Sequence, residues 1–279
     1  MNLADKYEQL QKILRELGRV AVAYSGGVDS SFLLKAAVDT LGPENVLACI
    51  SLGPAEPANM HERARKTAEA IGAELMIVEA GEMDDPDFTS NKADRCFHCK
   101  SRLCRTLLDV AKQRGFPHVV FGTNHDDLDD FRPGNNAMRI FGIRSPLAEA
   151  GLTKGEIREL SRQAGMSTAD QPASPCLASR IPYGLEVTEQ RLRQIDQAEG
   201  VLRSLGFVEV RVRHHDTIAR IEVRPQDVAK LMAEPSRSKV VEKLKALGFR
   251  YVTADLQGFR SGSLNESLSD EQKRTTLEA

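Results

Sequence analysis

The stretch Ser25-Gly26-Gly27-Val28-Asp29-Ser30 combines residue types that could bind a phosphate chain. Two glycines without Cβ atoms let an anion come close to the backbone, and a helix that starts here would offer unpaired N–H groups and a partial positive charge. Ser25 and Ser30 add hydroxyl donors, and Asp29 could hold a magnesium ion that bridges phosphate oxygens. No Gly-Lys-Ser or Gly-Lys-Thr follows, so the common P-loop is excluded. The stretch predicts a different phosphate-binding loop; a plain glycine turn is the alternative.

A pair of cysteines could bind metal. Cys96 and Cys99 have the Cys-x-x-Cys spacing, which can hold one metal ion or one edge of an iron–sulfur cluster. Cys176 lies in a loop that contains two prolines and could be a third ligand, so that three irons of a four-iron cluster are held and the fourth stays open. A redox pair, a zinc site that includes His98, and Cys104 as the third ligand are alternatives that the spacing leaves open.

The region around Cys176 carries cations that could serve a reaction. Arg180 follows the cysteine by four residues and could lower the pKa of its thiol; a loop cysteine near a surface arginine is the alternative. Arg211 and Arg213 alternate along a predicted strand, so they project from one face, where they could bind phosphate or stay solvated.

Apolar strands that alternate with amphipathic helices would position these residues. The pattern predicts an α/β fold with a doubly wound parallel sheet, in which ligands bind beyond the carboxyl ends of the strands. The loop at 25–30, Ser51 and Gly122 all fall at that edge. Cys49, within an apolar strand, and Cys104, on the apolar side of a helix, are expected in the core. The predicted strands are at 20–24, 45–51, 75–78 and 118–122.

The character of the sequence changes near residue 183. A long helix, two alternating strands, a helix near 227–247 and a last strand near 250–256 predict a smaller C-terminal α+β domain. Its carboxylates, such as Glu199 and Glu222, are expected at the surface. The predicted division is a first domain at 1–183, the small domain at 184–260 and a polar, frayed tail at 261–279.

Composition limits the classes of protein that fit. The chain has 279 residues, of which 41% are hydrophobic and 28% charged, as in an ordinary soluble globular protein of two modest domains or one large one. Its net charge of −2 argues against a large nucleic-acid footprint. No apolar run approaches a membrane span and the N-terminus does not read as a signal peptide, so we expect a cytoplasmic protein without disulfides.

The loop at 25–30, placed after a first strand, resembles the PP-loop of the adenine-nucleotide α-hydrolases. These enzymes split ATP between the α- and β-phosphates and transfer AMP to a substrate oxygen. The chain as a whole, over about residues 5–260, resembles one family among them, the LarE-type ATP-dependent sulfur transferases of nickel-pincer nucleotide biosynthesis. The resemblance rests on residues 25–30, 95–100, 122–124, 130–134 and 176–184.

This resemblance implies an enzyme that uses ATP and Mg²⁺ to adenylate the carboxylates of pyridinium-3,5-biscarboxylic acid mononucleotide and then replaces AMP by sulfur. It places the pyrophosphate side of ATP on the loop and the nucleoside near Ser51 and Gly122. Cys176 matches the essential cysteine of the family. The residues that it implies for pyrophosphate are Ser25, Gly26, Gly27, Asp29 and Ser30, and those for the phosphate and carboxylates of the substrate are Arg180, Arg211 and Arg213.

Two sulfur sources occur in this family. In one branch the essential cysteine gives up its own sulfur; in the other, three cysteines carry a 4Fe-4S cluster that delivers sulfide. With Cys96 and Cys99 beside Cys176, this sequence resembles the cluster branch, which needs a sulfide donor as partner. The resemblance also implies a homo-oligomer, a hexamer in the family. A tRNA-thiolating PP-loop enzyme, an ammonia-dependent synthetase and a non-enzymatic nucleotide-binding module are the alternatives.

Overall fold

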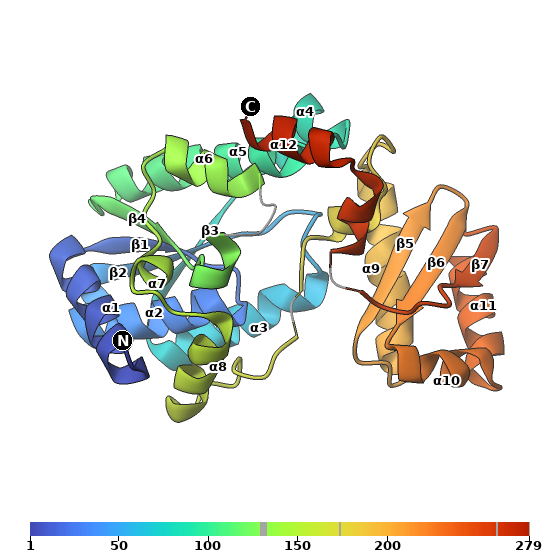
Figure 1. Ribbon diagram of the computed structural model, residues 1–279, viewed down its shortest axis with the longest axis horizontal. Coiled ribbons are helices and arrows are strands. Elements are labelled where there is room, and N and C mark those ends of the chain that lie inside the picture. The colour runs from blue at the N-terminus through green and yellow to red at the C-terminus, as the bar shows by residue number, and fades with distance from the viewer. Residues whose placement is uncertain (129–132, 173, 261, 279) are drawn as a thin grey trace. The chain divides into compact units, whose positions relative to one another are not determined.

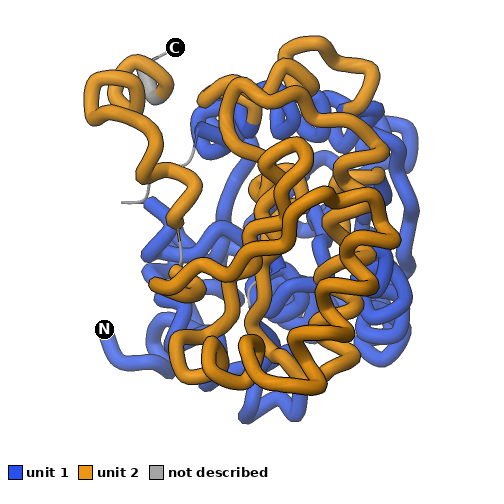
Figure 2. The backbone as a smooth tube through the Cα atoms, turned by 90° about the vertical axis from the view of Figure 1, so that its right-hand side faces the viewer, with its two compact units in different colours: residues 1–53, 58–82, 96–174 blue, residues 54–57, 83–95, 175–279 orange. Residues whose placement is uncertain are grey.

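The computed structural model describes residues 1–128, 133–172, 174–260 and 262–278. The chain forms two compact units, coloured separately in Figure 2. Residues 130–132 of the motif at 130–134 lie outside the described residues. The predicted boundary at residues 183–184 stays a prediction. Unit 1 consists of residues 1–53, 58–82 and 96–174, and unit 2 of residues 54–57, 83–95 and 175–279.

Unit 1 is built on a four-stranded parallel sheet, which confirms the predicted doubly wound α/β fold. Its strand order is β3-β2-β1-β4, so the chain reverses direction across the sheet between β1 and β4. In the register of the central strands, Val22 lies opposite both Ala48 and Val120. The strands are β1 (Val20–Ala23), β2 (Val46–Ser51), β3 (Glu74–Val78) and β4 (His118–Phe121).

Helices cover both faces of this sheet (Figure 1). α1, α2, α3, α7 and α8 pack on one face, and α5 and α6 on the other. None of the helices within the described residues is long and apolar enough to cross a membrane. The helices are α1 (Leu3–Leu17), α2 (Val28–Leu41), α3 (Ala58–Ile71), α5 (Arg95–Gln113), α6 (Pro133–Ile140), α7 (Pro146–Glu149) and α8 (Lys154–Gln163), with 3-10 turns η1 (Pro43–Asn45) and η3 (His125–Leu128).

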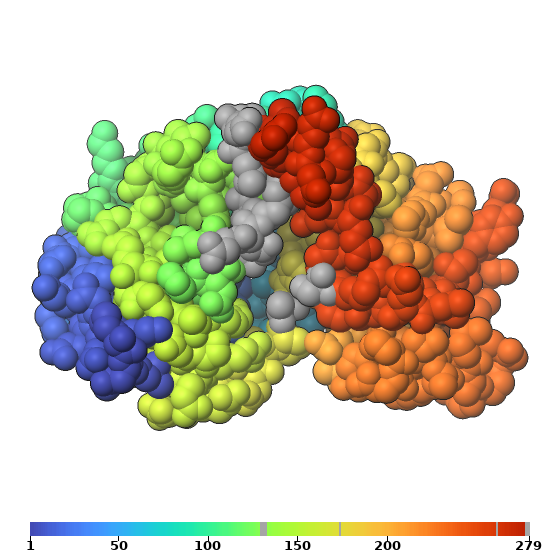
Figure 3. Space-filling model, in the orientation of Figure 1, coloured from blue at the N-terminus to red at the C-terminus, as the bar shows by residue number. Residues whose placement is uncertain are grey.

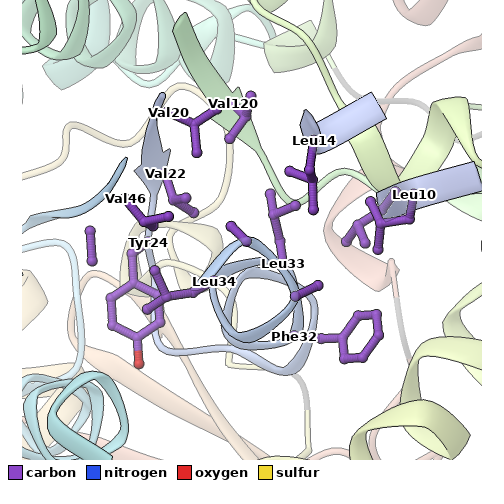
Figure 4. Close-up of a cluster of buried hydrophobic side chains, with 14 of the residues drawn as sticks. Leu10, Leu14, Val20, Val22, Tyr24, Phe32, Leu33, Leu34, Val46 and Val120 are labelled. Atoms are coloured by element: carbon purple, nitrogen blue, oxygen red, sulfur yellow. The ribbon is translucent and has the colours of Figure 1, made fainter. Parts of the chain in front are cut away.

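The core of unit 1 follows from the alternation of side chains along the strands. Val22 and Val120 point to the face that α1 and α2 cover, where they meet Leu14 and Leu33 (Figure 4). Each of these four side chains is fully buried, which stabilises the fold by about 1.5–3 kcal/mol per side chain. At the surface of this unit, α1 (blue) and α8 (yellow-green) lie side by side, joined by an ion pair at 2.8 Å between Lys6 and Glu156 (Figure 3).

The opposite face of the sheet holds the two cysteines that the sequence places in the core. Cys49 of β2 is 2% exposed and Cys104 of α5 is 0% exposed, and both pack in one cluster with Leu107. Burial raises the pKa of each thiol to about 11. Both thiols therefore stay protonated near neutral pH. Their burial confirms the expectation that they are core residues.

Unit 2 holds the predicted α+β domain. Its sheet has the order β5-β6-β7, with an antiparallel pair β5–β6 and a parallel pair β6–β7. Ala198 and Leu202 of α9 pack on this sheet with Leu244 of α11. The elements are α4 (Pro86–Thr89), α9 (Glu189–Ser204), β5 (Val210–His215), β6 (Ile218–Val223), α10 (Val228–Met232), α11 (Ser236–Ala246), β7 (Tyr251–Ala254) and α12 (Asp270–Glu278), with 3-10 turns η2 (Glu82–Asp84), η4 (Leu177–Arg180), η5 (Pro225–Asp227) and η6 (Ser263–Ser267).

The single helix predicted near 227–247 is wrong, because the structure has the separate helices α10 and α11 there. Ala233, between them, has an extended backbone with φ −84° and ψ 154°. Pro235 lacks an N–H group and disfavours a helical conformation at Glu234, so the helix is interrupted at this point.

The predicted polar tail contains regular structure. η6 and α12 lie within it, and Tyr183 donates to Asn265 at 3.0 Å. The described residues of the segment that the sequence expects to fray are thus mostly helical.

Candidate active site

The loop at 25–30 joins β1 to α2 in unit 1, and hydrogen bonds of its two serines connect its two ends. The hydroxyls of Ser25 and Ser30 lie 3.0 Å apart, and Ser30 Oγ donates to the carbonyl of Gly27 at 3.2 Å. The backbone N–H of Ser25 donates to Ser30 Oγ at 3.2 Å. Gly27 is the N-cap of α2 and supplies no side-chain cap, so the first turn of the helix offers backbone N–H groups to a ligand.

Two positions at this site require glycine, because neighbouring atoms lie too close to leave room for a Cβ atom. Gly26 has φ +72°, and a Cβ atom on it would lie 2.8 Å from the Cβ of Ala64 on α3. A Cβ atom on Gly122, which follows β4, would lie 2.9 Å from the backbone N of Ser30. Any larger residue would push the end of β4 away from the loop. The structure therefore brings Gly122 and the predicted phosphate loop together.

Ser51 ends β2, next to β1, so it lies at the same carboxyl edge of the sheet as the loop. The reversal of strand order between β1 and β4 is the place where open α/β sheets bind ligands. Residues that the sequence predicts for ATP thus gather at one edge of unit 1, although no contact in the structure tests their individual roles.

Asp29 has a partner that sequence reasoning missed. Lys154, the first residue of α8, donates to Asp29 Oδ2 at 2.5 Å. The other oxygen, Oδ1, is buried and has no hydrogen-bond partner among the described residues. Mg²⁺ in phosphate sites is often held by one or two carboxylates, with phosphates and water completing its shell, so a carboxylate with one orphaned oxygen fits it. Asp29 can therefore hold Mg²⁺, and Lys154 adds a positive charge at the same point.

Cys176 lies in unit 2, immediately before η4, and its side chain is partly exposed. Arg180, at the end of this turn, is buried and fixes the loop from inside. Its Nη1 donates to the carbonyl oxygens of Pro175 at 2.6 Å and Cys176 at 3.1 Å. Its Nε and Nη2 donate to the carboxylate of Glu199 at 2.8 and 3.1 Å.

The other two predicted arginines lie on β5, beside the same loop. Arg213 donates to the carbonyl of Ser179 at 2.7 Å and forms a two-pronged ion pair with Glu222 at 2.9 Å. Burial, together with the positive charges of Arg180 and Arg213, lowers the pKa of Arg211 to about 10. Unit 2 thus brings Arg180, Arg211 and Arg213 to the loop of Cys176. Their contact with a substrate stays a prediction.

Glu199 and Glu222 are not at the surface, contrary to expectation. They are 0% and 1% exposed, and each is paired with one of the predicted arginines. The burial of Glu199 could have been predicted, because it shares one face of α9 with the apolar Ile195 and Leu202 at helical spacing.

The Cys-x-x-Cys pair lies within the first two turns of α5, where Cys96 is exposed and Cys99 is partly exposed. No group of three or more His, Cys, Asp or Glu side chains within the described ranges could hold a metal ion. Cys96 and Cys99 belong to unit 1 and Cys176 to unit 2. The three-cysteine cluster therefore stays a prediction.

Comparison with known proteins identifies the family. No family model matches the chain. It is 38% identical over 273 residues to pyridinium-3,5-bisthiocarboxylic acid mononucleotide synthase from Lactiplantibacillus plantarum, and the alignment covers 98% of both chains. It is 42% identical over 267 residues to uncharacterized protein slr1717 of Synechocystis, covering 96% of this chain and 99% of that one.

A more distant relative supports the superfamily. The NH(3)-dependent NAD(+) synthetase of Methanococcoides burtonii is 27% identical over 159 residues, which cover 52% of this chain and 56% of that protein. With near full-length similarity at 38% identity and the phosphate loop in place at the edge of a parallel sheet, this chain belongs to the LarE-type family of ATP-dependent sulfur transferases within the PP-loop superfamily.

Proposed function

We propose that this enzyme converts the carboxylates of pyridinium-3,5-biscarboxylic acid mononucleotide into thiocarboxylates at the expense of ATP. The proposal rests on the site in unit 2. There a partly exposed cysteine lies in a loop that accepts hydrogen bonds from Arg180 and Arg213, and the charges of these two act on Arg211. Arginines suit the phosphate and carboxylates of such a substrate. The name of the Lactiplantibacillus plantarum relative supports this choice of substrate.

Activation of the carboxylate is assigned to unit 1. A carboxylate oxygen would attack the α-phosphorus of ATP, so that an acyl-adenylate forms, the bond to the β-phosphate breaks and pyrophosphate leaves. The N–H groups of Gly26, Gly27 and the start of α2 would hold the charge of the pyrophosphate, helped by the hydroxyls of Ser25 and Ser30. Mg²⁺ at Asp29 would neutralise phosphate oxygens.

The nucleoside of ATP is assigned to the neighbouring strand ends. Ser51 ends β2 and Gly122 follows β4, so both lie at the carboxyl edge, on either side of the loop after β1. Gly122 lets the backbone of this edge come close to the loop. A nucleoside bound there would have its α-phosphate above the N-terminus of α2.

Sulfur then replaces AMP. A sulfur nucleophile would attack the carbonyl carbon of the adenylate, forming a C–S bond while the C–O bond to AMP breaks. We assign the phosphate and remaining carboxylate of the substrate to Arg211 and Arg213. Arg180, buried beneath the loop, would act on the substrate through the position of Cys176.

The sulfur carrier that we propose is a 4Fe-4S cluster held by Cys96, Cys99 and Cys176. These thiols fit the role because all three are at least partly exposed, whereas Cys49 and Cys104 are buried and stay protonated. When bound, such a cluster would supply an open iron at which sulfide is carried and renewed, so an external sulfide donor is a proposed partner.

Cys176 alone is the other possible source. Its sulfur would first form the thioester; the Cα proton would then leave and the Cβ–S bond break. The thiocarboxylate would depart with the sulfur, and dehydroalanine would remain at position 176. A homo-hexamer, as in the family, is the assembly that we propose for either route.

Anaerobic reconstitution of the full chain, followed by iron analysis and turnover with ATP, tests these assignments. We expect about four irons per chain, AMP and pyrophosphate in equal amounts, and several thiocarboxylates per chain. Cys96→Ala should lose the iron, whereas the matched variant Cys104→Ala, further along α5, should keep it. A protein mass lowered by one hydrogen sulfide would assign the sulfur to Cys176 itself. No AMP from ATP and the dicarboxylate would refute the function, and thiocarboxylate from Cys176→Ala would refute the role of Cys176 in sulfur transfer.

A further inference from the structure

A segment without a predicted role, residues 83–95, is bonded to the Cys176 region inside unit 2. Two backbone bonds join it to residues 184–187: the N–H of Gly184 donates to the carbonyl of Asn91 at 3.0 Å, and the N–H of Val187 donates to the carbonyl of Thr89 at 2.8 Å. The segment thus runs beside the stretch that follows η4, and two of its side chains reach further into that stretch.

Asn91 is the first of these side chains. It is 0% exposed and has φ +55°, a left-handed conformation that asparagine adopts more readily than most residues. Its Nδ2 lies 2.8 Å from the carbonyl oxygen of Pro182, 2.7 Å from that of Leu185 and 3.3 Å from that of Ile181. One buried amide therefore holds three carbonyl groups of the stretch that follows Cys176.

Arg95 is the second side chain and is 3% exposed. Its Nη1 donates to Asn91 Oδ1 and, at 2.9 Å, to the carbonyl of Ala178, two residues after Cys176. Its guanidinium also lies 5.8 Å from the ring centroid of Tyr183. Arg95 and Asn91 thus form one buried network that reaches both ends of the turn η4, and the chain continues directly from Arg95 into Cys96.

We propose that Arg95 and Asn91 are positioning residues for the sulfur-transfer step. Neither is assigned a contact with substrate; together they fix the backbone after Cys176 and tie it to the segment that leads into the Cys-x-x-Cys pair. This inference rests on the proposed function, since it assigns to the network a role in delivering sulfur from the Cys176 loop.

The physical reason is the precision that group transfer needs. A reacting sulfur held about 1 Å from its productive position can cost on the order of a hundredfold in rate. Loops keep such positions only where buried hydrogen bonds restrict them. Formation of the adenylate, assigned to the loop at 25–30 in unit 1, does not depend on this network. Loss of the network should therefore separate the two halves of the reaction.

The test compares Asn91→Gly and Arg95→Gln with the wild-type full chain. Glycine keeps the left-handed backbone at position 91 and removes only the side-chain bonds, so local strain is avoided. Pyrophosphate and thiocarboxylate are measured in the same reaction, with ATP, the pyridinium dicarboxylate and sulfide. We expect pyrophosphate release within about twofold of wild type and thiocarboxylate formation lowered by about tenfold to a hundredfold. Arg95→Lys, which keeps a donor for the carbonyl of Ala178, should recover part of the loss.

Arg19 offers a matched control, because it also donates to a backbone carbonyl, that of Gly115 at 2.8 Å, and lies 4.5 Å from an aromatic ring centroid. Arg19→Gln should leave both products unchanged. Wild-type ratios of the two products in Asn91→Gly and Arg95→Gln, or a parallel fall of both products, would overturn the positioning role. If the wild-type chain itself makes no thiocarboxylate, the proposed function fails, and this inference fails with it.

Discussion

Replacement of Arg180 by methionine separates a structural from a substrate-binding role for this arginine. Methionine fills much of the same space and removes the guanidinium, which is 0% exposed. The carboxylate of Glu199 would keep two partners, Arg203 at 2.6 Å and the backbone N–H of Val212 at 3.2 Å. The carbonyl of Pro175 would lose the Arg180 donor, and that of Cys176 would keep the backbone N–H of Ser179 at 3.0 Å.

The size of the effect follows from burial. Removal of one partner of a buried ion pair destabilises proteins by about 3–5 kcal/mol, because the other charge stays in a place without water. Since Arg203 still pairs with Glu199, we expect the lower end, about 3 kcal/mol. The exposed pair of Arg162 and Asp170, at 2.9 Å with side chains 48% and 76% exposed, is the contrast. Arg162→Met should leave the unfolding midpoint almost unchanged, because an exposed ion pair in water contributes little.

Urea unfolding of the full chain measures both variants. The sequence has no tryptophan, so circular dichroism in the far ultraviolet is the suitable signal. The double variant Arg180→Met/Glu199→Leu removes both buried charges and should be more stable than Arg180→Met alone. A loss for Arg180→Met no larger than that of Arg162→Met would refute the reasoning. An unchanged unfolding midpoint with a raised KM for the dicarboxylate would instead indicate that Arg180 binds substrate.

Two further predictions concern other charged groups. Lys154→Met should lower pyrophosphate release by about a hundredfold at saturating ATP, because it removes the cation beside Asp29. The control Lys35→Met, which breaks an exposed pair on α2, should have no effect. Equal pyrophosphate release by Lys154→Met and the wild type would exclude a role for Lys154. Burial, followed by the charge of Arg191, lowers the pKa of His214 from 6.5 to about 4, so the unfolded chain binds the extra proton first as the pH falls. The free energy of unfolding should therefore drop by up to about 3 kcal/mol as the pH falls from 6.5 to 4. Urea titrations at several pH values measure this drop, and His214→Phe should remove it. The same pH dependence in His214→Phe as in the wild type would contradict the assignment.

The features that the sequence predicts correctly are those written in neighbouring residues. The four parallel strands appear as short apolar runs, and the loop at 25–30 is marked by its own glycines, serines and aspartate. Cys49 and Cys104 could be placed in the core because the residues around them are apolar at strand or helix spacing. In each case the deciding interactions lie within one or two turns of the chain.

The features that the sequence did not indicate depend on contacts between distant residues. Lys154 meets Asp29 across 125 positions, and neither residue type at either place suggests the other. Arg95 reaches Ala178 across 83 positions, from a segment that reads as a polar loop. Composition alone also misplaced Glu222, because a carboxylate is usually exposed unless a specific partner such as Arg213 compensates its burial.

Long-range pairing also divides the three arginines that the sequence treats alike. Arg180 and Arg213 each face a buried glutamate, so their charges are compensated within the fold. For Arg211, burial and then the positive charge of Arg180 lower the pKa to about 10 against the opposite effect of Glu199, so on balance the surroundings disfavour its charge. An anion bound beside Arg211 would reverse that penalty, so binding and protonation there support each other. We therefore propose that the phosphate of the substrate binds at Arg211 and its remaining carboxylate at Arg213, whereas Arg180 holds the loop of Cys176 in place.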